Sequence, residues 1–268
     1  FAAGGDACFA DSVRLVGPDG PVAAQLTDVE YWPDGKKHVK SARLCFVVEG
    51  LRPLASAQYT LTYGRKKAAP AVATDLRIKP ARNQVEITTS QIGVRLPLGS
   101  RTSDAPGPMA AMRQGAGAWA GGSALTGSGK VASWAAELIE SGPVLARLRL
   151  TYCFVDGNTA TFTATVVAGD NAVRWDMAVT QDRPALAAEF RLATMPGVKQ
   201  AVTLQGYGQW SRADRTAALA PGDQPFTWIC PNTSIAKILP VCSWAVKLAT
   251  EWGADLRVTA RDPAAWAD

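Results

Sequence analysis

Residues 31–46 read YWPDGKKHVKSARLCF, and this stretch holds a turn flanked by two runs that alternate as β-strands do. In Trp32-Pro33-Asp34-Gly35 the proline presets φ, the aspartate caps its own backbone and the glycine accepts positive φ, which is the chemistry of a reverse turn. After the turn, from Val39 to Glu49, apolar side chains recur at every second position: Ala42, Leu44, Phe46 and Val48. The pattern predicts strands on both sides of the turn, the second with one buried face.

The neighbouring segments predict a compact β unit around this turn. Residues 58–63 (QYTLTY) alternate as a further strand, which Gly64 and the basic cluster Arg65-Lys66-Lys67 end. Towards the N-terminus, residues 13–16 form a short strand closed by the turn Gly17-Pro18-Asp19-Gly20. We therefore predict a small β domain over residues 1–67, with residues 68–74 as the connector.

Residues 68–268 predict a second, larger β domain. Alternation from Val144 to Phe154 indicates a long half-buried strand, and turns at 156–158 and 169–171 continue it into a meander. A meander with one apolar face needs a second sheet to cover it, so we predict an antiparallel β-sandwich. We expect the Gly- and Ala-rich residues 97–130 to be an open surface loop, and residues 211–224 to be a polar loop. The other strands are expected at 75–78, 85–88, 92–96, 161–166, 173–177, 190–192, 202–204, 244–248 and 256–258.

Composition is ordinary for a globular chain, and it restricts the chemistry. The net charge of +5 is that of a solvated basic surface, which would also attract an acidic polysaccharide. Without an aromatic-basic stripe we expect no nucleic-acid partner, and no run reaches the roughly 18 apolar residues of a membrane span. The five cysteines include no C-x-x-C spacing, so we expect no metal and no redox motif. Cys45 and Cys153 are expected as small buried side chains, whereas Cys230 and Cys242 flank a proline-containing segment and could form a disulfide.

Familiar catalytic motifs are absent or incomplete. Gly115-x-Gly117-x-x-Ala120 lacks the preceding strand and following helix of a dinucleotide site, and Gly127-Ser128-Gly129-Lys130 lacks the flanking residues of a phosphate loop, so we expect no cofactor. The single histidine, His38, is expected as a solvated turn residue. No spacing singles out a pair of catalytic carboxylates, so no catalytic residue is assigned.

The nine tryptophans are the strongest indication of a ligand, because sugar rings stack on exposed aromatic rings. Trp175 and Trp244 fall on apolar strand faces and are expected in the core. Trp119, in the glycine-rich segment, and Trp210 lie outside strong strand patterns and are the candidate sugar-binding side chains. Arg212 could pair with a uronate carboxylate in bidentate fashion.

The order of motifs in the first hundred residues resembles the N-terminal RIFT-barrel domain of exo-rhamnogalacturonan lyase-like proteins. The resemblance rests on residues 15–22 with Gln25, the WPDG turn with Lys40, Ala42-Arg43-Leu44 and Phe46, and Tyr59-Thr60-Leu61-Thr62-Tyr63-Gly64; it continues more loosely at 139–143 and at Ala146-Arg147. The family's turn continues with a tryptophan where this chain has Ser41. The resemblance implies an all-β chain with a small RIFT-type β-barrel followed by a central β-sandwich.

The resemblance also implies a secreted or periplasmic protein that acts on rhamnogalacturonan-type pectin together with a C-terminal helical toroid. Lyase chemistry of this kind needs a base and a cationic group beside the uronate. Because this chain has no helical periodicity, we expect it to be the N-terminal β region of such a protein, inactive alone. We expect a leader upstream of Phe1 that has been removed or was never included. A non-catalytic carbohydrate-binding or scaffolding module, and the β region of a glycoside hydrolase, remain alternatives.

Overall fold

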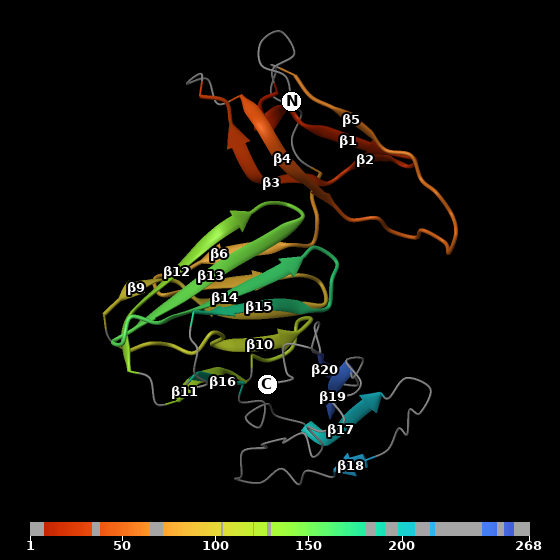
Figure 1. Ribbon diagram of the computed structural model, residues 1–268. Helices are drawn as coiled ribbons and strands as arrows, with labels where there is room; N and C mark the ends of the chain where they lie inside the picture. The colour runs from red at the N-terminus through yellow and green to blue at the C-terminus, as the bar shows by residue number, and fades with distance from the viewer. Residues whose placement is uncertain are drawn as a thin grey trace. The chain divides into compact units, whose positions relative to one another are not determined.

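The structure is a computed structural model that is built almost entirely of antiparallel strands (Figure 1). It describes residues 8–33, 38–64, 72–102, 104–119, 121–127 and 130–180, and the backbone of strands at 186–190, 198–206, 215–217, 243–250 and 255–259. Within these residues the only helical element is a single 3-10 turn, Ala10–Ser12. The predicted all-β class is confirmed. By its internal contacts the chain divides into two compact units, Phe1–Phe190 and Arg191–Asp268.

The N-terminal strands form two small antiparallel sheets. The first has the order β2-β1-β5, and the second pairs β3 with β4 across the predicted turn, of which Asp34 and Gly35 lie outside the described residues. Neither sheet is closed within the described residues, and the boundary at 67/68 lies in a segment outside them, so the barrel and its boundary stay predictions. The strands are β1 (Arg14–Gly17), β2 (Gly20–Val22), β3 (Ala24–Tyr31), β4 (Val39–Phe46) and β5 (Thr60–Thr62).

Two expectations for this region were wrong in detail. The strand after the turn ends at Phe46, so Val48 does not belong to its buried face and is 42% exposed. The other three residues of that face, Ala42, Leu44 and Phe46, are half-buried. His38 is buried rather than solvated, because its backbone bridges to Phe9 and its ring packs edge-on against the Phe9 ring at 4.7 Å between centroids. Contacts with a residue 29 positions away in the sequence cannot be read from a turn motif.

Two larger sheets follow and share one core, in a sandwich-like arrangement (Figure 1). One has the order β10-β8-β7-β6 and the other β15-β14-β13-β12-β9. The strands of the first sheet are β6 (Arg77–Pro80), β7 (Gln84–Thr88), β8 (Ile92–Pro97) and β10 (Ala111–Gln114). Those of the second are β9 (Gly99–Arg101), β12 (Val131–Ser141), β13 (Leu145–Phe154), β14 (Thr159–Val167) and β15 (Val173–Val179).

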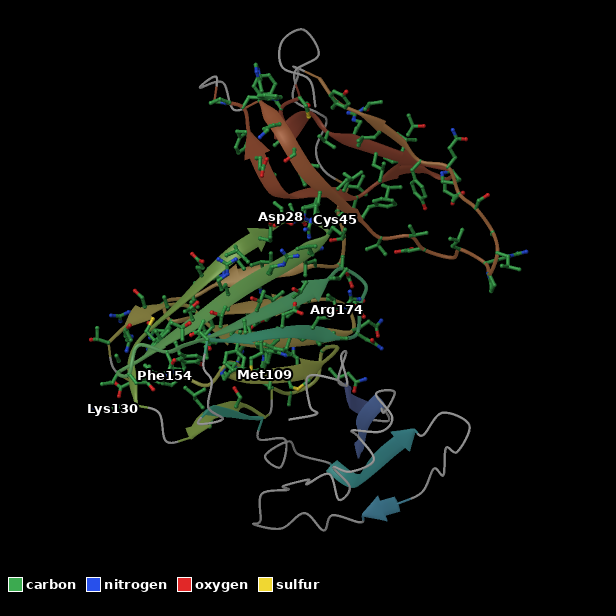
Figure 2. The ribbon with its side chains drawn as sticks, viewed as in Figure 1. Asp28, Cys45, Met109, Lys130, Phe154 and Arg174 are labelled. Atoms are coloured by element: carbon green, nitrogen blue, oxygen red, sulfur yellow. The ribbon has the colours of Figure 1, made fainter. Side chains whose placement is uncertain are left out.

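The core lies between the inner faces of these two sheets. Along β13 every second side chain is buried, as the alternation predicts, and the same holds for β14. Facing them are Val85 and Ile87 of β7 and Val94 and Leu96 of β8, all fully buried. Met109 and Phe154, labelled in Figure 2, belong to the same core. Burial of this apolar area, at roughly 25 cal/mol per Å², is the main force that holds the two sheets together.

The expected open loop at 97–130 was wrong, because three strands lie in it. β9 pairs with β12, β10 pairs with β8, and β11 (Ser123–Gly127) pairs with β16 (Leu186–Phe190). Strands of three to five residues, with mostly small side chains in β9 and β11, give little hydrophobic alternation, so only the pairing partner defines them. Strand β12, eleven residues long, was not predicted at all. The strand expected at 190–192 shares Phe190 with β16, and Arg191 and Leu192 lie outside the described residues, so the rest of that expectation stays a prediction.

The second unit contains one antiparallel sheet with the order β18-β17-β19-β20. Its strands β17 (Val198–Gly206), β19 (Ser243–Thr250) and β20 (Asp255–Thr259) contain the three predicted strands. The expected polar loop at 211–224 was wrong in part, because β18 (Arg215–Ala217) pairs with β17 there. Cys230 and Cys242 lie outside the described residues, so their disulfide stays a prediction, whereas Cys45 and Cys153 are half-buried free thiols in strands.

Candidate functional site

Trp119 is the predicted ligand-binding side chain whose surroundings the structure describes. It follows β10 and a turn, and its half-buried ring contacts two cations. The guanidinium carbon of Arg95 lies over the ring at 4.1 Å from the ring centroid, and that of Arg113 at 4.6 Å. Both distances are within the range of cation–π attraction. The segment after β10 is therefore held against the sheet by an aromatic ring and two positive charges.

Strand register explains how these groups come together. Lys79, Glu86 and Arg95 are direct cross-strand neighbours on β6, β7 and β8. In the adjacent row, Arg113 of β10 lies opposite Gly93 of β8. Because side chains alternate between the faces of a strand, these residues lie on the face opposite to the buried core positions. We call this surface the basic face; its members are Arg77, Lys79, Glu86, Arg95 and Arg113.

Gly93 makes room for the contact between the aromatic ring and the strand. A Cβ atom at this position would lie 2.9 Å from Cγ and Nε of Arg113 and 2.9 Å from Cη2 of Trp119. Any larger residue would push one of the two side chains away. The glycine therefore lets Arg113 lie flat on β8 with the tip of the indole ring beside it.

One carboxylate partly neutralises this surface. Oε2 of Glu86 accepts hydrogen bonds from Nε and Nη2 of Arg95, both at 3.2 Å. Its other oxygen is 4.0 Å from Nη2 of Arg113, which is longer than a hydrogen bond. With four cationic side chains against one carboxylate, the face keeps an excess of positive charge. Such a surface attracts anions.

The other predicted site residues fall in a part of the chain that the structure does not describe. Trp210 and Arg212 lie outside the described residues, so their role stays a prediction. Trp175 is half-buried and packs against the core, in agreement with its structural role, while the side chain of Trp244 is not among those described. Sequence reasoning missed Arg95, Arg113 and Glu86. The sequence signal that could have located them is the presence of polar side chains at alternate positions of otherwise apolar strands.

Two described carboxylates, Asp75 and Asp156, have a shifted pKa, and in both the pKa is lowered. Burial alone would raise the pKa of Asp75, but hydrogen bonds from the backbone and hydroxyl of Ser90 and from the backbone of Gly169 outweigh it and lower the pKa. The pKa of Asp156 is also lowered, by hydrogen bonds from Asn158. Both groups are thereby held as anions in turns. In the described part, His, Cys, Asp and Glu side chains form no group of three that could hold a metal ion.

The chain matches no protein-family profile and no curated protein. Among the described segments, no helix is long and apolar enough to cross a membrane.

Proposed function

We propose that this chain is the N-terminal β region of a secreted polysaccharide lyase-like protein, with a RIFT-type barrel and a β-sandwich, and that it holds an acidic, rhamnogalacturonan-type polysaccharide. In this proposal the catalytic groups lie in a C-terminal helical domain, and the chain alone is inactive. The resemblance of its motifs to exo-rhamnogalacturonan lyase-like proteins supports the family assignment. The basic face supports the choice of an acidic polymer.

The single observation that carries the proposal is the position of Trp119 among the cations of the basic face. A polymer of alternating rhamnose and galacturonate presents carboxylates at regular intervals, and a flat sheet surface can meet several of them. Arg95 and Arg113 supply fixed positive charge, and the exposed Lys79 lies one strand beyond Glu86. Charge-assisted hydrogen bonds to carboxylates are among the stronger contacts that a protein surface makes.

The lowered pKa values of Asp75 and Asp156 fit a binding role better than a catalytic one. A lyase base must accept a proton from the carbon next to the uronate carboxylate near neutral pH, and a carboxylate with a depressed pKa is a weak acceptor. Asp75 also uses both of its oxygens for hydrogen bonds within the fold. These groups serve the turns in which they lie.

The proposal is tested by incubating the purified chain with rhamnogalacturonan and with uncharged polysaccharides. Product is followed by the absorbance of unsaturated uronate, and binding by retention on each immobilised polymer. We expect retention on the acidic polymer alone and no product. Formation of product would place a complete lyase site in this chain, and equal retention on neutral polymers, or none, would contradict the proposed acidic ligand.

A further inference from the structure

Within the described part of the chain, the positive charge of Arg113 has no hydrogen-bond acceptor from the protein. A guanidinium carries five N–H donors, yet Arg113 donates no hydrogen bond within the described part of the chain, and its buried Nε has no partner. Its nearest carboxylate oxygen, on Glu86, is 4.0 Å away. A half-buried donor group without acceptors costs free energy that a bound anion would recover.

Three other arginines of the same unit donate hydrogen bonds to the protein. Nη1 of Arg77 donates to the backbone oxygens of Thr74 and Leu76 at 2.6 and 2.9 Å. Arg95 donates twice to Glu86, and Arg174 once to Asp170 at 3.0 Å. Arg113 therefore differs from Arg77 and Arg95 on the basic face, which both donate hydrogen bonds within the protein.

The position of Arg113 is fixed before any ligand arrives. Its side chain lies against β8 over Gly93, and the Trp119 ring contacts its guanidinium. A cation held in place loses little conformational entropy when it binds, which is the usual source of affinity in preorganised sites. The planar fork of a guanidinium matches the two oxygens of a carboxylate.

From these contacts we infer that Arg113, next to Arg95, is a subsite for the carboxylate of a uronic acid, and that Trp119 is a positioning residue which supports the two guanidiniums. This inference rests on the proposed function for the source of the carboxylate, a galacturonate-containing polymer. Glu86 is the internal competitor, because its negative charge lies between the two arginines and opposes a second carboxylate.

The test compares Arg113→Gln with Arg149→Gln. The control removes the same charge from the outer face of the other sheet, where the Arg149 side chain is 50% exposed and 3.5 Å from Glu137. Affinity is measured by titration with polygalacturonate and with its fully methyl-esterified form, which lacks the negative charge. We expect R113Q to weaken polygalacturonate binding about ten- to a hundredfold and R149Q to change it by less than about twofold. The esterified polymer is expected to bind weakly to all forms.

Two further variants separate a site from a structural role. Arg113→Lys keeps the charge but loses the planar fork, and we expect it to bind more weakly than the wild type. Glu86→Gln removes the competing carboxylate, and we expect it to bind more tightly. Circular dichroism and thermal unfolding confirm that each variant is folded. Equal affinities of R113Q and R149Q, equal binding of the esterified polymer, or weaker binding by E86Q would each overturn the inference.

Failure of this inference is distinguishable from failure of the proposed function. If the wild type retains acidic polymer but R113Q does so equally well, the function stands and the subsite is wrong. If no polymer is retained, but free galacturonic acid changes the tryptophan fluorescence of the wild type and not of R113Q, the subsite stands and the polymer-binding function is wrong. Inorganic sulfate in the same fluorescence titration tests whether the subsite prefers a carboxylate, and stronger binding of sulfate would contradict that preference.

Discussion

Asp75 shows how one side chain joins three separate turns of the sandwich-like part. Its oxygens accept hydrogen bonds from the backbone and hydroxyl of Ser90, at 2.8 and 2.7 Å, and from the backbone of Gly169 at 2.8 Å. Asp75→Asn keeps an acceptor on one side only, and we expect a loss of about 1–3 kcal/mol in the free energy of unfolding. Urea unfolding at pH 7 measures it, with the exposed Asp156→Asn as the matched control.

The same contacts predict an acid dependence. Because the pKa of Asp75 is lower in the folded chain than in the unfolded chain, its contribution to stability is complete above the unfolded value of about 3.9 and is lost as the pH falls through the folded value. The stability difference between wild type and D75N should therefore be constant from pH 5 to 8 and shrink below about pH 4. A difference that grows with falling pH would contradict the lowered pKa.

Tyr152 makes the stability of the fold depend on pH in the alkaline range. It is fully buried in the core, its ring packs edge-on against Phe162 and its hydroxyl donates to the backbone oxygen of Pro106. Burial raises the pKa of this phenol. The neutral hydroxyl therefore contributes fully to the free energy of unfolding below the pKa of tyrosine in the unfolded chain, about 10. This contribution is lost as the pH rises above that pKa. Thermal unfolding between pH 8 and 11 should show a steeper alkaline loss for the wild type than for Tyr152→Phe.

At the scale of elements, Gln25 connects strand β3 to the turn between β12 and β13. Its Oε1 accepts hydrogen bonds from the backbone of Val144 at 3.1 Å and of Leu145 at 2.9 Å, and all three residues are buried. A Cβ atom on Gly142 would collide with the Gln25 amide. Both Gln25 and the segment 139–143 belong to the motifs that carry the family resemblance, and the fold brings them into contact.

Because of this contact, a substitution of Gln25 and a substitution of Gly142 should lower the stability of the protein in the same way. Gln25→Ala leaves two buried backbone N–H groups without an acceptor, and Gly142→Ala displaces the glutamine; each should lower the free energy of unfolding by about 1–3 kcal/mol. The double variant should cost less than the sum, because both changes remove the same contact. Urea unfolding of the three variants measures the coupling, with Gly157→Asn in an open turn as a control. Strict additivity would mean that the two residues act independently.

The sequence predicted the strands whose two faces differ strongly in hydrophobicity, and it missed the strands whose two faces are similar. Strands β13 and β14 alternate between apolar and polar side chains over nine or ten residues, so hydrophobic periodicity located them. Strands β9, β10 and β11 have only three to five residues each, and only long-range pairing defines them. The candidate site depends on that same pairing: Trp119 was selected from the sequence, but the register that brings Arg113 beside Gly93 was not readable from it.

At the scale of the whole molecule, the net charge of +5 and the single histidine predict how polymer binding depends on pH and salt. Histidine is the one side-chain type whose ordinary pKa lies between about 5 and 8, and the chain contains a single histidine, so the protein's charge changes little between pH 6 and 8. Retention on acidic polymer should be nearly constant from pH 6 to 8 and fall below about pH 4, where uronates become neutral.

Because the contacts are ionic and lie at the surface, retention should also decrease as salt shortens the Debye length from about 10 Å at 0.1 M to about 3 Å at 1 M. Chromatography on immobilised polygalacturonate at these pH values and salt concentrations measures both trends. Retention that persists unchanged at 1 M salt would mean that apolar stacking, rather than the charges of the basic face, holds the polymer.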